Sequence, residues 1–317
     1  MKRAAISVDL DGLVHYARIH GIPGSALDDR AHSLHLAVAL PRFLALFERF
    51  GIPATLFVIG EDVGTPGSTS LEAAARAGHE LASHSHTHPY ALARAPEDEV
   101  DRELSRAEDA LRGVSGSRPV GFRAPGYALS ATMLGTLARR GYRYDASVFP
   151  AAPYYLAKAA VLGAMALAGR RSAAVLDRPG VLLAPRRPYR PALEAPYQRG
   201  DAPLLELPMS VTPLLRLPFF GTLVTTAPWT LVRRAYRAVA ADAFLSLELH
   251  AVDLLDAEDG IPAELVRVQR DLAVPVDRKE RRLADVLAWI SRDFTFTTLA
   301  GSATALGAGP SARDHVP

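Results

Sequence analysis

The stretch His79-Glu80-Leu81-Ala82-Ser83-His84-Ser85-His86-Thr87-His88 contains four of the ten histidines in this chain of 317 residues. Its first part, Glu80–Ser83, has the pattern of a short strand, and polar residues follow it directly. His84 and His88 are four residues apart, a spacing that places both imidazoles on one face of a helical turn. Two such nitrogens can meet one zinc-like ion at about 2.0–2.1 Å. The stretch therefore predicts a metal site beside the end of a strand.

The expected third ligand lies in the opening strand, Ala4-Ala5-Ile6-Ser7-Val8-Asp9-Leu10-Asp11-Gly12. Asp9 and Asp11 are two residues apart, so in a strand they point to the same side of the sheet. One carboxylate and two imidazoles leave positions on the ion open for water and substrate, as catalytic metal sites require. Either motif alone also occurs in surface helices or turns that bind no metal. Their conjunction in this order is what favours the metal site.

Three further stretches place chemically active side chains beside expected strands. Gly121–Tyr127 sets the permanent cation of Arg123 next to a Pro-Gly turn, where backbone N–H groups can point into a cleft. Tyr142–Pro150 is an aromatic-rich strand with one carboxylate. Phe244–His250 is an apolar strand that ends in a histidine, and such a strand delivers the residue to the open end of a sheet or barrel.

In this order, the motifs resemble those of the polysaccharide deacetylase family, the NodB-homology carbohydrate esterases of family 4 type. The five matching segments are Asp-Leu-Asp, GHELASHSHTH, FRAP, YDASVFP and LELH, and they span residues 6–250. The resemblance implies an α/β fold, a distorted (β/α) barrel similar to a TIM barrel. It also implies metal-dependent removal of an acyl group, usually acetyl, from an amino sugar.

The resemblance assigns a role to each reactive side chain near the metal. It makes Asp11, His84 and His88 the metal ligands and Asp9 the general base, which Arg123 would keep ionised and aimed. Zinc is the expected ion, and a site of this composition also accepts cobalt, nickel, manganese or iron. A carboxylate beside the metal rather than on it suits the removal of a proton from the attacking water.

The remaining roles concern the oxyanion and the leaving group. The resemblance places the oxyanion donor at the backbone N–H of Gly126, with Tyr127 beside it in the substrate site. It makes His250 the general acid that protonates the leaving amine. It makes Asp145 the partner that orients the His250 ring.

Two departures from the usual family pattern bear on the substrate. Leu10 separates two acidic residues that are usually adjacent, and Ala124 stands where the third motif usually has proline. The first departure resembles the branch that holds intracellular peptidoglycan deacetylases, allantoinase-like enzymes and deformylases of lipid-linked aminoarabinose. The expected function is therefore N-deacetylation of an amino sugar in a glycan or lipid-linked glycan precursor. The alternatives are a deformylase or other amidase with the same metal site, and a catalytically silent protein that binds glycan or membrane.

Composition and periodicity indicate the organisation of the chain. With 49% hydrophobic and 22% charged residues it can bury one substantial core. Strand-like runs alternate with helical patterns, as a parallel barrel requires. We expect one barrel over residues 1–300, an insertion at about 151–203 and a disordered tail over 301–317. The polar segment His15–Leu34 is expected to be a loop over the first motif.

Charge, cysteine content and the chain start indicate partners and location. The net charge of +2 is too small to indicate a nucleic-acid partner. The absence of cysteine excludes disulfides and thiolate ligands and is typical of a reducing compartment. A cleavable signal at Met1-Lys2-Arg3 would remove the strand that carries Asp9, so we expect a cytoplasmic protein.

The segment 153–171 is the most distinctive part of the expected insertion. It is almost entirely apolar up to residue 168, and Gly169-Arg170-Arg171 follow. It is shorter than the roughly 20 apolar residues of a membrane span. It could be a buried helix, a subunit contact or an interfacial helix that reaches a lipid-linked sugar at the inner face of the membrane. A second apolar stretch, 214–224, could share that peripheral membrane contact.

Overall fold

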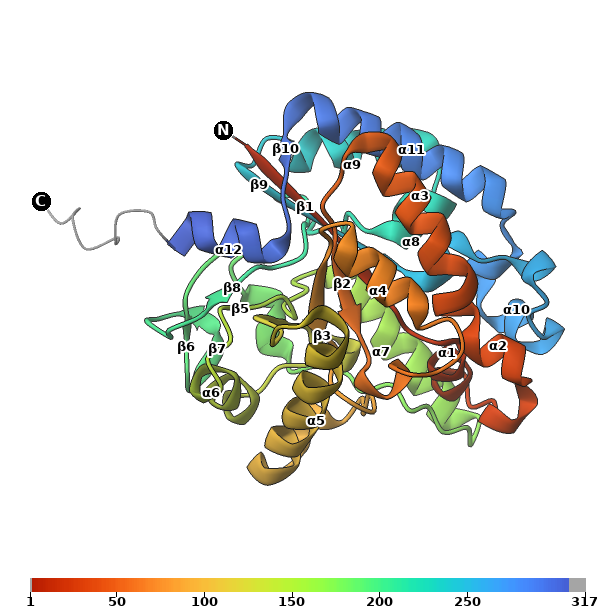
Figure 1. Cartoon of the computed structure of the whole chain (residues 1–317), viewed down its shortest axis with the longest axis horizontal. Coiled ribbons are helices and arrows are strands. Elements are labelled where there is room, and N and C mark those ends of the chain that lie inside the picture. Colours follow the sequence, from red (N-terminus) through yellow and green to blue (C-terminus); the bar gives the residue numbers. More distant parts are fainter. Residues whose placement is uncertain (1, 308–317) are drawn as a thin grey trace, which may run out of the picture.

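The computed structural model describes residues 2–307, in which eight strands form one sheet whose pairings are all parallel. These strands are β1 (Arg3–Asp9), β2 (Thr55–Val58), β3 (Glu80–Ser83), β4 (Gly121–Phe122), β5 (Tyr144–Asp145), β8 (Leu205–Glu206), β9 (Phe244–His250) and β10 (Thr295–Phe296). The order runs β9-β1-β2-β3-β4-β5-β8, and β10 pairs with the first residues of β1 (Figure 1). Each strand run expected from the sequence lies in this sheet.

Helices connect the strands and surround the sheet (Figure 1). They are α1 (Leu13–Ile19), α2 (Asp29–Leu34), α3 (Leu40–Phe50), α4 (Thr69–Arg76), α5 (Glu97–Ser115), α6 (Ala131–Arg139), α7 (Ala152–Leu167), α8 (Gly221–Thr226), α9 (Trp229–Val239), α10 (Ala263–Val268), α11 (Val276–Asp293) and α12 (Leu299–Gly307). The helical patterns of the sequence at 39–50, 69–77, 97–111, 130–140, 230–241 and 281–292 correspond to α3, α4, α5, α6, α9 and α11, and α11 begins at Val276, before its pattern starts. Gly51 ends α3 with a φ of 61°, the left-handed cap that favours glycine.

Alternate residues of the central strands point to opposite faces of the sheet, either outward to the helices or inward to the barrel. Ile6 and Val8 of β1 and Leu249 of β9 pack outward against the helices in the largest apolar cluster. Because side chains of a strand alternate between its faces, Asp9 and His250 point to the inside of the curved sheet. The period-two pattern of the strands therefore decides which polar groups enter the barrel.

The barrel is closed by side chain and backbone contacts rather than by a ladder between β8 and β9. Ser210, which follows β8, donates its backbone N–H to the Ser246 carbonyl at 3.1 Å. Ser246 in turn donates its N–H to the Ser210 hydroxyl at 2.9 Å. The fold is therefore the distorted (β/α) barrel that the sequence predicted.

The chain between β5 and β8, where the sequence predicted an insertion, contains α7 and the hairpin of β6 (Pro191–Ala192) and β7 (Ala195–Arg199). No side chain of α7 is fully buried, so the alternative of a buried core helix is wrong. The helix is apolar on every side, yet it lies on the barrel instead of inside it. Within residues 2–307 no helix combines the length and apolar character needed to cross a bilayer.

Two other expectations need correction. The segment 15–34 is not a loop, because α1 and α2 occupy most of it and pack through Tyr16, Ala31 and Leu34. Of the tail expected to be disordered, residues 301–307 belong to α12, whose Ala303 packs against the inner core. Residues 308–317 lie outside the described part of the chain. Both errors have the same cause. Each segment consists mostly of polar or small residues, and its few apolar side chains form a stripe too short to indicate a helix.

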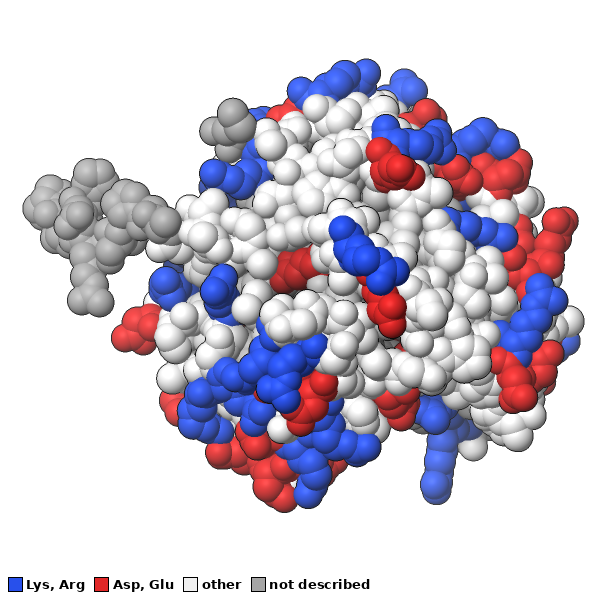
Figure 2. All heavy atoms as spheres, viewed as in Figure 1, with Lys and Arg blue, Asp and Glu red and all other residues white. Residues whose placement is uncertain are grey.

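The charged side chains are distributed without a single dominant sign. Figure 2 shows Lys and Arg interspersed with Asp and Glu around a broad uncharged area on one face of the molecule. This distribution agrees with the net charge of +2.

Candidate metal centre and catalytic cleft

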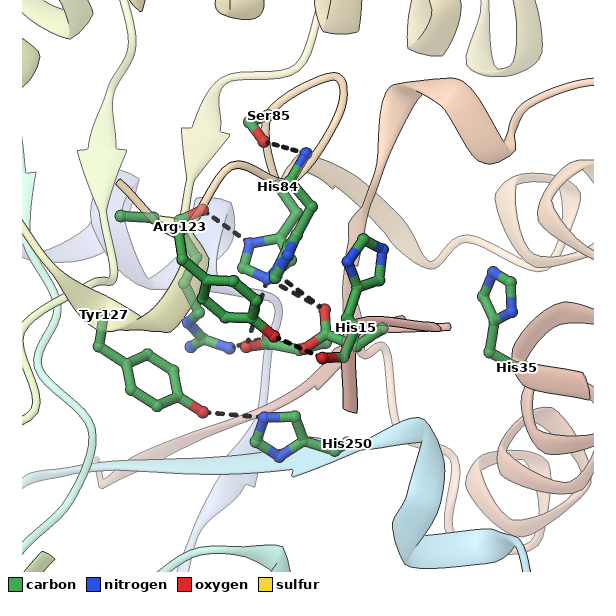
Figure 3. Close-up of polar contacts among 12 residues, drawn as sticks. His15, His35, His84, Ser85, Arg123, Tyr127 and His250 are labelled. Carbon is green, nitrogen blue, oxygen red and sulfur yellow. Dashed lines mark hydrogen bonds and ion pairs between the residues drawn. The ribbon is translucent and has the colours of Figure 1, made fainter. Parts of the chain in front are cut away.

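The predicted site residues converge at the carboxyl ends of the parallel strands. Asp9 ends β1 and lies in register with His250, which ends β9. His84 follows β3 and Arg123 follows β4. Figure 3 shows that His84, Arg123 and His250 come from separate elements and lie around one site. Parallel strands bring their carboxyl ends to one rim, so residues far apart in sequence become neighbours.

Asp11, His84 and His88 form a compact set of metal donors. The Asp11 Oδ1 atom lies 3.3 Å from His84 Nε2 and 3.4 Å from His88 Nε2. Two ligands that are each about 2.0–2.1 Å from one ion at a tetrahedral angle are about 3.3 Å apart. Among the described residues, Asp11 Oδ1 and His88 Nε2 have no hydrogen-bond partner although both are buried. Such buried orphan atoms are rare, and a shared divalent ion would satisfy them together.

The two histidines reach this geometry without the helical turn that their spacing suggested. His84 donates its Nδ1–H to the Arg123 carbonyl at 2.7 Å, which leaves its Nε2 lone pair facing Asp11. The segment is a loop in which Ser85 and His88 have φ values of 64° and 54°. The His88 N–H donates to the Ser85 hydroxyl at 3.1 Å. Left-handed backbone at non-glycine residues is strained, and here it turns both rings to one point.

The pKa shifts favour metal binding at His88 and Asp11, whereas Asp11 and Asp9 raise the pKa of His84 against its burial. Burial lowers the pKa of His88 well below its usual value, so its ring is neutral, as a ligand must be. Burial opposes ionisation of Asp11, but His88 and His84 hold the pKa of its carboxyl well below the usual range. His15, which the sequence reasoning missed, packs against His88 with ring centroids 4.3 Å apart. Burial lowers the pKa of His15 to about 4, so it adds no charge beside the ligands.

Asp9 and Arg123 form a buried ion pair beside the metal donors. Arg123 is completely buried and donates from Nη1 to Asp9 Oδ1 and to the Ser7 hydroxyl, the latter at 3.1 Å. Its Nε–H donates to the Ala146 carbonyl at 2.9 Å, and its guanidinium lies 4.1 Å from the centre of the Phe57 ring. Asp9 Oδ2 is 3.9 Å from His84 Nε2, so Asp9 borders the donor set without joining it. Burial raises the pKa of Asp9, and Arg123 opposes that shift.

His250 is held by Glu248 and Tyr127. Its Nδ1 lies 3.0 Å from Glu248 Oε1, and its Nε2 lies 2.9 Å from the Tyr127 hydroxyl (Figure 3). Tyr127 also donates its hydroxyl to Glu248 at 2.7 Å. Burial alone would lower the pKa of His250, but Glu248 more than offsets this and raises the pKa well above its usual value. The imidazole is therefore held as a proton donor.

Asp145 is not the partner of His250, contrary to the prediction. Its Oδ1 accepts from the Ser147 hydroxyl at 2.7 Å, and that hydroxyl accepts the Ala124 N–H at 2.8 Å. The reason is topological, because β5 is separated from β9 by β8 and the unpaired junction beyond it. Asp145 instead supports the turn that follows Arg123. Glu248 could have been found in the sequence, since it lies two residues before His250 and so on the same face of an otherwise apolar strand.

Comparison with known proteins agrees with this geometry. Residues 28–144 match the model of the family described as polysaccharide deacetylase. The peptidoglycan deacetylase of Helicobacter pylori is 31% identical over 157 residues, which cover 48% of this chain and 52% of that protein. The match to the polysaccharide deacetylase family therefore covers residues 28–144 of this chain. It spans about half the length of the curated relatives that it matches.

Two solved structures share the fold of this chain along almost its whole length. A protein from Mycobacterium smegmatis, assigned as a polysaccharide deacetylase, has a TM-score of 0.61 and 20% identity and covers 99% of this chain and 94% of its own. The allantoinase PuuE has a TM-score of 0.60 and 14% identity, with 97% and 91% covered. At these identities the comparison shows the barrel fold alone.

Gly126 and Tyr127 lie on the wall of a cleft beside the donor set. Both residues have left-handed backbone, with φ values of 65° and 68°. A Cβ atom on Gly126 would lie 3.0 Å from the Tyr90 ring, so the close approach requires glycine. The turn aims the Tyr127 hydroxyl at Glu248 and His250. Tyr127 is therefore hydrogen-bonded to His250. Contact of Gly126 or Tyr127 with the substrate stays a prediction.

The cleft itself has a volume of about 330 Å³. It is the size of a small-molecule site, which typically measures about 300–1,000 Å³. Its floor contains Asp9, Asp11, His84 and His250, and α7 supplies one wall with mostly apolar side chains. A molecule in this cleft would lie against these four side chains at once.

Proposed function

We propose that this chain is a metal-dependent hydrolase that removes an N-acyl group, acetyl in the first instance, from an amino sugar. The observation that supports the proposal is that three convergent candidate metal donors lie at one cleft, next to the buried Asp9–Arg123 ion pair and the His250–Glu248 pair. A binding protein has no physical need for a base and an acid on either side of a metal. The name of the Helicobacter pylori relative supports a glycan as the substrate.

The residues divide the reaction between them. A divalent ion held by Asp11, His84 and His88, with zinc the first candidate, would polarise the acyl carbonyl and make its bound water a stronger nucleophile. Asp9 accepts a proton from the attacking water, and Arg123 keeps that carboxylate ionised and aimed. His250 donates a proton to the nitrogen as the carbon–nitrogen bond breaks. The products are a free carboxylate, such as acetate, and the amino sugar.

The test is release of acetate and of formate by the metal-loaded protein. The substrates are N-acetylated and N-formylated amino sugars, peptidoglycan fragments and polyprenyl phosphate-linked amino sugars. Acetate release by the wild-type protein supports the deacetylase. Formate release alone would favour a deformylase, for which the chemistry at the carbonyl is the same. Stoichiometric metal with no release from any substrate would favour the silent binding protein.

The proposal for the acid predicts a shift in pH dependence when Glu248 is changed to glutamine. His250 acts in its protonated form, so activity is present below its pKa and is lost as the pH rises through it. Because Glu248 raises the pKa of His250, removing that charge lowers it. We expect the alkaline limb of kcat/KM to move about 1–2 pH units lower. The kinetic profile and NMR titration of the His250 ring both measure this shift.

The matched control for that experiment is Glu206→Gln, because the Glu206 carboxyl is equally buried but accepts the Val148 N–H instead of contacting His250. It should leave the alkaline limb in place. If Glu248→Gln leaves both the limb and the ring titration unchanged, Glu248 does not set the protonation of His250.

We also propose peripheral membrane contact through α7 and the stretch that precedes α8. Leu167 is 93% exposed and Leu214 is 94% exposed, which is unusual for leucines of a folded protein. The two stretches adjoin, since the rings of Phe220 and Tyr154 have centroids 6.3 Å apart. Exposed apolar side chains beside a cleft suit a substrate that is anchored in lipid. The cytoplasmic location expected from the sequence stays a prediction.

Membrane contact predicts that Leu214→Ser combined with Leu215→Ser will weaken binding to phospholipid vesicles. Loss of two leucines from the bilayer interface should lower the partition coefficient by about tenfold or more. Vesicle flotation measures the change, and Leu306→Ser in α12 is the control because it removes a leucine from another part of the surface. Equal flotation of all three proteins, or none for the wild type, would contradict the contact.

A further inference from the structure

One face of α7 lines the cleft and changes in character along the helix. Lys158 lies nearest the catalytic turn, where its Nζ donates to the Gly126 carbonyl at 3.2 Å. Val161, Leu162 and Met165 follow on the same face, at spacings of three, four and seven residues from Lys158, and all line the cleft. The wall of the cleft therefore begins with a cation and continues as an apolar track.

Lys158 has bonding capacity that the described residues leave unused. Its ammonium group carries three donors, and its one hydrogen bond within residues 2–307 is the bond to Gly126. Burial lowers the pKa of Lys158 to about 8, so the amine is still largely protonated at neutral pH. Of the described residues that line the cleft, Lys158 is the only Lys or Arg. An anion in the cleft would find its opposite charge there.

We propose that Lys158 binds an anionic group of the substrate and that the adjoining face of α7 holds an apolar chain attached to that group. This deepens and rests on the proposed function, because it makes the substrate class an anionic amphiphile, such as an amino sugar carried on a lipid phosphate. The Gly126 contact sets the anion within a few bond lengths of the turn that faces the acyl group. Val161, Leu162 and Met165 then lie along the exit from the cleft.

A competing interpretation is that Lys158 only braces the catalytic turn through the Gly126 carbonyl. In that case its loss would weaken every ligand of the cleft, charged or neutral. If Lys158 instead recognises charge, its loss weakens anionic ligands selectively. The two interpretations therefore differ in the ratio of two binding constants.

The experiment measures binding by calorimetry to the metal-loaded full-length chain. The probes are decyl phosphate, ethyl phosphate and neutral decyl glucoside, and the proteins are wild type, Lys158→Met, Lys158→Arg and Leu162→Ser. Lys158→Met should weaken decyl phosphate about tenfold or more and change decyl glucoside less than about twofold. Lys158→Arg should restore most of the affinity. Leu162→Ser should weaken decyl phosphate several-fold and leave ethyl phosphate unchanged.

Several results would overturn the proposal. If phosphate binds equally well to the wild type and to Lys158→Met, the anion binds to the metal ion and not to Lys158. If Lys158→Met weakens the binding of decyl phosphate and of decyl glucoside equally, Lys158 only braces the catalytic turn. If a nucleoside diphosphate sugar, added as a fourth probe, binds through Lys158 and decyl phosphate binds no more tightly than ethyl phosphate, the substrate is soluble and the apolar part of the proposal is wrong.

The outcome is separate from that of the proposed function, because binding is measured without turnover. If neutral soluble sugars release their acyl group and Lys158 does not matter for this, the chain is a hydrolase but its substrate is not an anionic amphiphile. If Lys158 binds phosphate selectively and no substrate releases an acyl group, the binding proposal stands and the hydrolase proposal fails. Thermal unfolding of each variant checks that α7 is retained.

Discussion

Replacing Asp9 with asparagine is expected to lower the rate of acyl release by about 10²–10⁴-fold, the range that a general base contributes. The amide cannot accept the proton of the attacking water at neutral pH. Asp9 lies beside the metal donors rather than among them, so the metal content should stay at the wild-type level. The measurement is kcat for acyl release, with the metal content of the same protein sample determined by elemental analysis.

The control for Asp9→Asn must separate lost chemistry from lost stability. The neutral amide of this variant would leave the buried Arg123 without its counter-charge, and breaking a buried ion pair costs about 3–5 kcal/mol. Asp242→Asn makes the same change in another largely buried Asp–Arg pair, formed with Arg186 away from the cleft. We expect Asp242→Asn to lose stability and keep its rate per folded molecule. Full activity of Asp9→Asn would remove Asp9 from the reaction.

Replacing His84 with alanine is expected to abolish both metal binding and acyl release. The change removes one of three donors, whose Nε2 lies 3.3 Å from Asp11 Oδ1, and it leaves only two protein ligands. We expect near-stoichiometric metal in the wild-type protein and less than about one tenth of that in the variant, by the ligand count that such sites require. Activity should fall below detection even when zinc is added at the concentration that saturates the wild type.

A second measurement makes this test independent of activity. Metal that binds only the folded state at about 100 times its Kd stabilises that state by about 2.7 kcal/mol, so zinc should raise the Tm of the wild-type protein. It should leave the Tm of His84→Ala unchanged. His86→Ala is the matched control because His86 lies in the same loop but outside the donor set. If His84→Ala retains stoichiometric metal and the zinc-dependent rise in Tm, the ligand assignment is wrong.

The site residues that could be predicted are those carried by strands or by compact motifs. Asp9 and His250 end adjacent strands, and a period of two sends both to the inside of the barrel without any further information. The ordered motifs also predicted that His84, His88 and Arg123 would meet these two. What they share is that local backbone geometry and sequence spacing nearly determine where the side chain goes.

The errors arise where side-chain contacts, and not strand periodicity, decide the local geometry. Asp145 was expected beside His250, but strand order placed Glu248 and Tyr127 there instead. The loop between His84 and His88 adopts left-handed backbone because the Ser85 hydroxyl and the Arg123 carbonyl hold it. Neither contact can be read from spacing, since each depends on how the chain folds around the site.

By itself, the sequence determined the alternation of strands and helices, the inward direction of Asp9 and His250, and a donor set that suits a divalent ion. Periodicity and residue chemistry are local properties, so they can be read from the sequence without knowledge of the fold. Only the tertiary structure decided that Glu248 holds His250, that α7 forms an apolar cleft wall instead of a buried helix, and that Lys158 faces the catalytic turn. Those features depend on which surfaces meet when the barrel closes, and packing between distant segments determines that.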